Sequence, residues 1–155
     1  SSDIPLQSGL TCSRASTGCI INGDFAKKVE AFNGYMQAIS LEWHVTGGTP
    51  PPEATATRPQ GIHSNACHGS ATCLDIDCRN NNCSVPDIIA TSNVATRAGA
   101  FAVYEVSDKT RADALKAEFN ARESNVCLML VPSIATTGGE HFSLYNARTQ
   151  TGNCY

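Results

Sequence analysis

Apolar side chains recur every three or four residues in one early segment, and this spacing predicts a helix. The pattern covers residues 25–39, and either Asn22 or Asp24 can cap its start. An apolar stripe at helical spacing is most often a buried core face, so we assign it no binding role. The stripe consists of Phe25, Val29, Phe32 and Met36.

Two later segments carry the signals that start and stop helices. Ser84 precedes a segment with Pro86 in its first turn and Gly99 just past its end, which is typical of a capped helix. Asp108 can cap a third helix, which we expect to run to about Arg122.

Short apolar or alternating runs predict the strands. They cover residues 40–46, 74–77, 101–106, 126–134 and 141–145. The run at 126–134 is continuously apolar, so we expect a central strand that is covered on both faces. Together the patterns predict an α+β fold, with about three helices packed on a mostly antiparallel sheet of four or five strands.

Length and composition predict one domain with an irregular arm. A chain of 155 residues is long enough to bury a sizeable core. Residues 1–23 are rich in Ser, Thr and Gly and predict an irregular arm, whereas residues 24–155 form a single domain. Three consecutive prolines, at residues 50–52, indicate an extended surface loop.

Charge and hydropathy exclude two classes of partner. The net charge is −3, and the eleven Lys and Arg residues are scattered, so we expect no nucleic-acid partner. No apolar run approaches the roughly 18 residues that a membrane span requires, so we expect no membrane span.

Cysteine usage indicates an oxidising compartment. Eight cysteines are present, and none lies in a C-x-x-C pair, which disfavours the alternative of a cytosolic zinc protein. We therefore expect a disulfide-stapled protein that is extracellular or at the cell surface. A chain that begins at Ser1 fits a mature form after removal of a signal peptide. The expected pairs are Cys12–Cys19, Cys67–Cys73, Cys78–Cys83 and Cys127–Cys154.

The most informative stretch for chemistry surrounds His68 and Asp75. His68 lies in a turn of small residues, and Asp75 lies in a Leu-Asp-Ile-Asp strand, on the same face as Asp77. His141, on the last predicted strand, is the best candidate for a third ligand. Two histidines and one carboxylate form a zinc-ligand set that leaves a position open for water. The alternative is that His68 and Asp75 are polar residues of a disulfide-knotted surface loop.

This arrangement resembles the hedgehog/D-alanyl-D-alanine peptidase superfamily. The shared features are His68, six intervening residues, Asp75 and a late Gly-x-His on the final strand. The resemblance spans roughly residues 25–146 and includes the order of helices and strands. It implies a peptidase-like domain with one zinc ion held by His68, Asp75 and His141. The Cys-His-x-x-x-x-Cys-x-Asp form also resembles secreted proteins of uncultured small-genome bacteria.

The chain departs from the peptidase pattern near the expected catalytic base. A general base would lie two or three residues before His141, where this chain has two glycines. Glu140 is then the reserve base, although strand alternation points it to the other face unless the strand is bulged. In another alignment Ser143 takes a ligand position. Arg58 is the candidate for steadying a substrate carboxylate or an oxyanion.

Two function classes compete, and a third class has no functional site. The first is a zinc peptidase that acts on peptidoglycan stem peptides at the cell wall, with feeble turnover because its base is missing. The second is a non-catalytic module, such as an extracellular filament or surface-layer subunit, that binds another cell-surface protein or self-associates. The third is a small disulfide-rich protein, such as an inhibitor or toxin, with no site.

Overall fold

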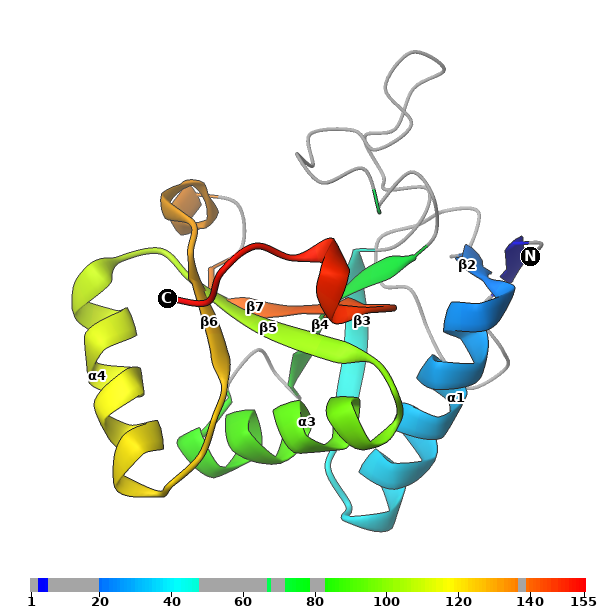
Figure 1. Cartoon of the computed structure of the whole chain (residues 1–155), viewed down its shortest axis with the longest axis horizontal. Helices are drawn as coiled ribbons and strands as arrows, with labels where there is room; N and C mark the ends of the chain where they lie inside the picture. The colour runs from blue at the N-terminus through cyan, green and yellow to red at the C-terminus, as the bar shows by residue number, and fades with distance from the viewer. Residues whose placement is uncertain (1–2, 6–19, 48–66, 68–71, 79–82, 137–138) are drawn as a thin grey trace.

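The computed structural model is an α+β domain built around one five-stranded sheet (Figure 1). It describes residues 3–5, 20–47, 67, 72–78, 83–136 and 139–155. The predictions made for Arg58, His68 and the Cys12–Cys19 loop lie outside these residues.

The strand order of the main sheet is β3-β4-β7-β5-β6. All neighbouring strands are antiparallel except β5 and β6, which are parallel, so the prediction of a mostly antiparallel sheet is confirmed. The strands are β3 (Trp43–Gly47), β4 (Cys73–Cys78), β5 (Phe101–Val106), β6 (Cys127–Leu130) and β7 (His141–Tyr145). Two further strands, β1 (Asp3–Pro5) and β2 (Ile20–Asn22), pair within the segment predicted to be irregular.

Three α-helices pack against one face of the sheet and lie below and beside it in Figure 1. They are α1 (Gly23–Ala38), α3 (Val85–Arg97) and α4 (Lys109–Ala121). The starts of α3 and α4 follow the predicted caps: Ser84 Oγ accepts a hydrogen bond from Asp87 N, and Asp108 accepts one from Arg111 N. None of the helices in these described ranges is both long and apolar enough to cross a membrane.

The core lies between the helices and this face of the sheet. The stripe predicted on α1 is fully buried, and it packs with inward residues of the central strands. Tyr104 and Phe142 are cross-strand partners on this face, and their rings meet edge to face with centroids 4.8 Å apart. Because side chains alternate along a strand, the neighbours of Phe142, His141 and Ser143, point to the opposite face.

The prediction for residues 126–134 was wrong in one respect. β6 is short and lies at the edge of the sheet, not in its centre. The apolar run continues past the strand, but Pro132 begins a 3₁₀ helix there, and a proline has no N–H to continue a strand ladder. Leu130, the last residue of β6, is accordingly 36% exposed.

Two disulfides are described, and both match the predicted pairs. Cys67 bonds to Cys73, and Cys127 bonds to Cys154. Cys83 is also disulfide-bonded, but the predicted partner, Cys78, has a side chain outside the described part of the structure. The sulfurs of Cys67, Cys73 and Cys127 pack in a second cluster. That cluster lies on the sheet face opposite the helices, which is also the face of His141 and Ser143.

Candidate metal centre

Three neighbouring strands place polar side chains at one point on the face opposite the helices. Asp75 on β4 pairs with Ser143 on β7, and Glu105 on β5 pairs with His141 on β7. Since β7 lies between β4 and β5, these four side chains form a compact group. The last strand of the sheet along the sequence thus lies beside the strand that carries Asp75.

The donor atoms of three of these residues converge. One ligand atom each from Asp75, Glu105 and His141 lies within 4.8 Å of the other two. Nε2 of His141 is 3.3 Å from Oε2 of Glu105 and 3.7 Å from Oδ1 of Asp75. Asp75 is buried, and Glu105 and His141 are partly buried. Bringing two carboxylates out of water is unfavourable unless a cation or hydrogen bonds compensate them.

The imidazole of His141 is oriented by the backbone. Its Nδ1 lies 3.0 Å from the carbonyl oxygen of Gly139, which can only accept, so Nδ1 carries the proton and donates. Nε2 therefore faces the carboxylates. Gly139 has φ +79°, a conformation that favours glycine, and its N–H donates to the carbonyl of Ile134. This turn fixes the carbonyl that holds the imidazole, as in many metal-binding histidines.

The charge of His141 depends on the two carboxylates. Burial alone would lower the pKa of His141, but the hydrogen bond to Glu105 and the charges of Asp75 and Glu105 raise it to about 9. In the absence of a metal ion, a protonated imidazole therefore compensates the two acids at neutral pH. A metal ion that bound Nε2 would displace this proton.

Ser143 joins the two carboxylates. Its hydroxyl donates to Oδ1 of Asp75 at 3.1 Å and also contacts Oε2 of Glu105. The side chain is buried, and one hydroxyl proton can serve only one acceptor at a time. Comparison with the peptidase pattern offered Ser143 as a ligand. In the structure its hydroxyl instead contacts both acids.

The donor set can be compared with the geometry of known metal sites. A tetrahedral zinc ion with bonds of about 2.0–2.1 Å holds neighbouring ligand atoms roughly 3.3 Å apart. The distances from Nε2 of His141 to the carboxylates are 3.3 Å and 3.7 Å, and the three donor atoms all lie within 4.8 Å of one another, which is near this spacing. An imidazole nitrogen with two carboxylate oxygens suits zinc, iron or manganese better than calcium, which prefers oxygen ligands alone. The group of Asp75, Glu105 and His141 can therefore hold a metal ion.

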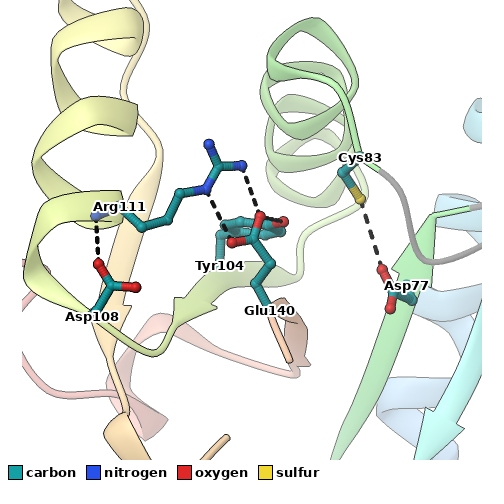
Figure 2. Close-up of polar contacts among 6 residues, drawn as sticks. All are labelled: Asp77, Cys83, Tyr104, Asp108, Arg111 and Glu140. Carbon is teal, nitrogen blue, oxygen red and sulfur yellow. Dashed lines mark hydrogen bonds and ion pairs between the residues drawn. The ribbon is translucent and has the colours of Figure 1, made fainter. Parts of the chain in front are cut away.

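Glu140 lies in a different contact, on the helix side of the sheet. Its carboxylate accepts hydrogen bonds from Nε of Arg111 at 3.0 Å, from Nη2 of Arg111 at 2.8 Å and from the Tyr104 hydroxyl at 2.6 Å (Figure 2). Burial raises the pKa of Glu140, but these hydrogen bonds outweigh it and lower the pKa overall. Glu140 thus points as strand alternation predicts, and it joins the start of β7 to α4.

Asp77 shares the face of Asp75 but belongs to other contacts. It is buried and pairs in register with His44 on β3. Its Oδ1 lies 3.8 Å from the sulfur of Cys83 (Figure 2). That sulfur is in a disulfide and has no proton to donate, so this contact is not a hydrogen bond. Within the described residues, the converging metal-ligand group does not include Asp77.

Two predicted site residues converge, and one member of the group was missed. Asp75 and His141 come together as predicted, whereas His68 and Arg58 lie outside the described residues. Glu105 was not anticipated, although a signal existed. It is the only charged residue in the strand Phe-Ala-Val-Tyr-Glu-Val, and a carboxylate in such a strand requires a partner.

Comparison with protein-family models, curated proteins and solved structures finds no match for this chain. The interpretation of the group therefore depends on its geometry and on the chemistry of its side chains.

Proposed function

We propose that this domain binds one divalent transition-metal ion, preferentially zinc, and hydrolyses peptide bonds at the cell wall. The observation that carries the proposal is the convergence of Asp75, Glu105 and His141 from three adjacent strands. Donors spaced for an ion, with an imidazole already oriented by Gly139, form a preorganised site. When bound, zinc would lower the pKa of a coordinated water and polarise a carbonyl group.

His68 would complete the ligand set. It follows Cys67, which is bonded to Cys73, and Cys73 begins the strand that carries Asp75. The disulfide thus ties the neighbour of His68 to the strand that carries a ligand. Two histidines with one or two carboxylates are a common donor set in zinc hydrolases.

The proposed substrate is a peptidoglycan stem peptide that ends in D-Ala-D-Ala. The resemblance of the His68, Asp75 and His141 pattern to D-alanyl-D-alanine peptidases supports this choice, and Arg58 would bind the terminal carboxylate. The two described disulfides fit an oxidising compartment, in which a cell-wall substrate would be met.

A non-catalytic binding or structural module is the second candidate, and one observation favours it. The group is partly compensated without a metal, because the raised pKa of His141 keeps one positive charge between the two carboxylates. The hydroxyl of Ser143 also donates a hydrogen bond to Asp75. In such a protein the group would stabilise the sheet, and the surface would bind another cell-surface protein or a second copy.

Zinc binding followed by hydrolysis separates these candidates. Purified protein would be titrated with zinc against a chromophoric chelator and then assayed on a D-Ala-D-Ala stem peptide. We expect one zinc ion per chain, an affinity reduced at least 100-fold in Asp75→Asn, and turnover that a chelator removes. Glu118→Gln, which alters an exposed residue of α4, is the matched control. Failure to bind zinc at micromolar concentration would exclude the metal-dependent function.

A further inference from the structure

We propose that the Cys127–Cys154 bond is a reducible latch, and that its reduction uncovers the edge of β6 for pairing with β6 of a second copy of this chain. The latch holds residues 151–155 against the edge strand of the main sheet. None of these residues belongs to the candidate metal centre, so the latch is independent of the proposed function.

Residues 151–155 cover the outer edge of β6. The N–H of Tyr155 donates to the carbonyl oxygen of Leu128 at 2.7 Å, which is the kind of bond that a further strand would make. The hydroxyl of Tyr155 donates to Oδ1 of Asp113 on α4 at 2.6 Å. Figure 1 shows the red end of this segment beside β6. The edge is thus covered within one copy of the chain.

β6 lacks the features that usually protect an edge strand. Charged side chains and prolines commonly prevent such strands from pairing with other chains. Residues 125–131 contain neither, and Pro132 follows only after the strand has ended. The side chain of Leu130 is 36% exposed. Among the described residues, the segment 151–155 therefore provides the protection that β6 does not provide itself.

The uncovered edge would be complementary to itself. The bond from Tyr155 shows that the peptide groups of Leu128 point outward, whereas the N–H of Val131 points inward and donates to Val106 on β5. Because these directions alternate along a strand, the peptide groups of Leu130 also point outward. In an antiparallel pair, Leu128 of one copy would lie opposite Leu130 of the other. A two-fold axis at Met129 would relate the copies, so the contact closes at a dimer.

The Cys127–Cys154 bond is the more accessible of the two described disulfides. Cys154 is exposed, whereas Cys67 and Cys73 are both buried. A reducing thiolate must reach one sulfur of the bond, and exposed disulfides are therefore the labile ones. Nη2 of Arg148 lies 3.8 Å from the sulfur of Cys154, so a positive charge would stabilise the thiolate formed there.

The reductant of the latch is a dithiol. One of its thiolates attacks Sγ of Cys154, forms a mixed disulfide and displaces Cys127 as a thiolate. The second thiol of the reductant then attacks the mixed disulfide and releases Cys154. Two electrons and two protons pass from the dithiol, which becomes a disulfide, to the two cysteines, which become thiols. Oxidation reverses the step.

Graded reduction of the whole chain tests the latch. The protein would be treated with increasing dithiothreitol and alkylated, and mass spectrometry would compare the labelling of Cys154 with that of Cys67 and Cys73. Amide exchange of Tyr155, followed by NMR, reports release of the segment. Size-exclusion chromatography with light scattering gives the molecular mass.

Three variants separate release from pairing. Cys127→Ala/Cys154→Ala opens the latch without a reductant. Leu130→Lys places a charge on the uncovered edge, and Ile39→Lys is its matched control, because Ile39 is an exposed apolar residue outside β6. Thermal unfolding verifies that each variant folds. If the double variant does not fold, the selectively reduced wild type provides the same comparison.

We expect Cys154 to be labelled at least about tenfold faster than Cys67 and Cys73. The amide of Tyr155 should then exchange at least about tenfold faster than in the oxidised protein. The reduced wild type, reduced Ile39→Lys and the double variant should have twice the monomer mass, whereas reduced Leu130→Lys should stay monomeric.

Three results would overturn the proposal. Equal labelling of the three cysteines would show that the bond is not selectively reducible. Unchanged exchange of the Tyr155 amide after reduction would show that the bond does not hold the segment. A reduced wild type that stays monomeric, or that forms assemblies without a fixed size, would exclude a second copy as the partner of β6.

Discussion

Ser143 is the residue on which the geometry of the two carboxylates depends. Its buried hydroxyl contacts both Asp75 and Glu105, so its removal changes the surroundings of both carboxylates. Groups that orient metal ligands in this way commonly affect affinity as strongly as weak ligands do.

We expect Ser143→Ala to weaken zinc binding about 10- to 100-fold, because the carboxylates lose their common donor. The metal-free protein should also lose about 1–3 kcal/mol of unfolding free energy, because a buried acceptor is left without its partner. Zinc competition and urea unfolding measure the two effects. Ser133→Ala, in the exposed 3₁₀ helix, is the matched control. Wild-type affinity in Ser143→Ala would show that the carboxylates are positioned by other contacts.

His141 makes the stability of the metal-free protein depend on pH. Its pKa is raised from the ordinary 6.5 to about 9, so the folded state binds its proton more tightly than the unfolded state. The resulting stabilisation is complete below pH 6.5 and is lost as the pH rises through 9. The shift corresponds to at most about 3 kcal/mol.

Urea unfolding in a chelator at pH 6 and at pH 9.5 should reveal this loss, and His141→Gln should remove most of the difference between the two values. Saturating zinc should also reduce the change of unfolding free energy with pH, because a zinc-bound imidazole has already released its proton. An equal change in unfolding free energy between the two pH values, in the wild type and in His141→Gln, would mean that another group causes the pH dependence.

At the scale of elements, the start of β7 is held between two parts of the molecule. His141 points to the candidate metal centre, whereas Glu140 accepts hydrogen bonds from Tyr104 on β5 and Arg111 on α4. Strand alternation explains why adjacent charged residues take part in separate networks.

Glu140→Ala should destabilise the fold by about 1–3 kcal/mol, chiefly because the hydroxyl of buried Tyr104 loses its acceptor. The ion pair with Arg111 adds little, since the Arg111 side chain is 41% exposed and water screens it. Zinc affinity should be unchanged. Lys109→Ala, which breaks an exposed ion pair on α4, should change the unfolding free energy little and serves as the control in urea unfolding. A loss of zinc affinity in Glu140→Ala would connect the two networks.

The elements were more predictable than their pairing. Local signals identified the caps of α3 and α4, and alternation placed His141 and Ser143 on one face. The position of β7 between β4 and β5 depends on long-range pairing that no local pattern encodes. Glu105 was missed for that reason: its strand could be recognised, but its neighbour across the sheet could not. The edge position of β6 was missed in the same way, because a continuous apolar run does not indicate which strands flank it.

At the scale of the whole molecule, disulfides hold the face that the helices leave uncovered. Cys67, Cys73 and Cys127 pack in one cluster with Val103 and Tyr145, and Cys127 is bonded to the exposed Cys154. Both pairs could be predicted because one closes a short loop and the other ties a strand to the last residues of the sequence.

The two bridges should have separable effects. Replacing Cys127 and Cys154 by Ala removes a bridge with a sequence separation of 27 and should lower the unfolding free energy by about 3–4 kcal/mol with little change in zinc affinity. If His68 is a ligand as proposed, replacing Cys67 and Cys73 should weaken zinc binding as well, because His68 directly follows Cys67 in the sequence. Calorimetry with zinc titration compares the double variants. Equal zinc affinity in both would argue against His68 as a ligand.

The central position of β7 makes assembly of the candidate metal centre depend on the last strand of the sheet along the sequence. β7 is the last strand along the sequence, yet it separates β4 from β5, and the Ser143–Asp75 hydrogen bond spans 68 residues. A nascent or partly exported chain that lacks β7 has neither His141 nor the strand that brings the two acids together. If the domain cuts peptides, it cannot do so while it is being made, and a chain truncated before residue 141 would be inert. A chain without β7 therefore lacks the complete group of Asp75, Glu105 and His141.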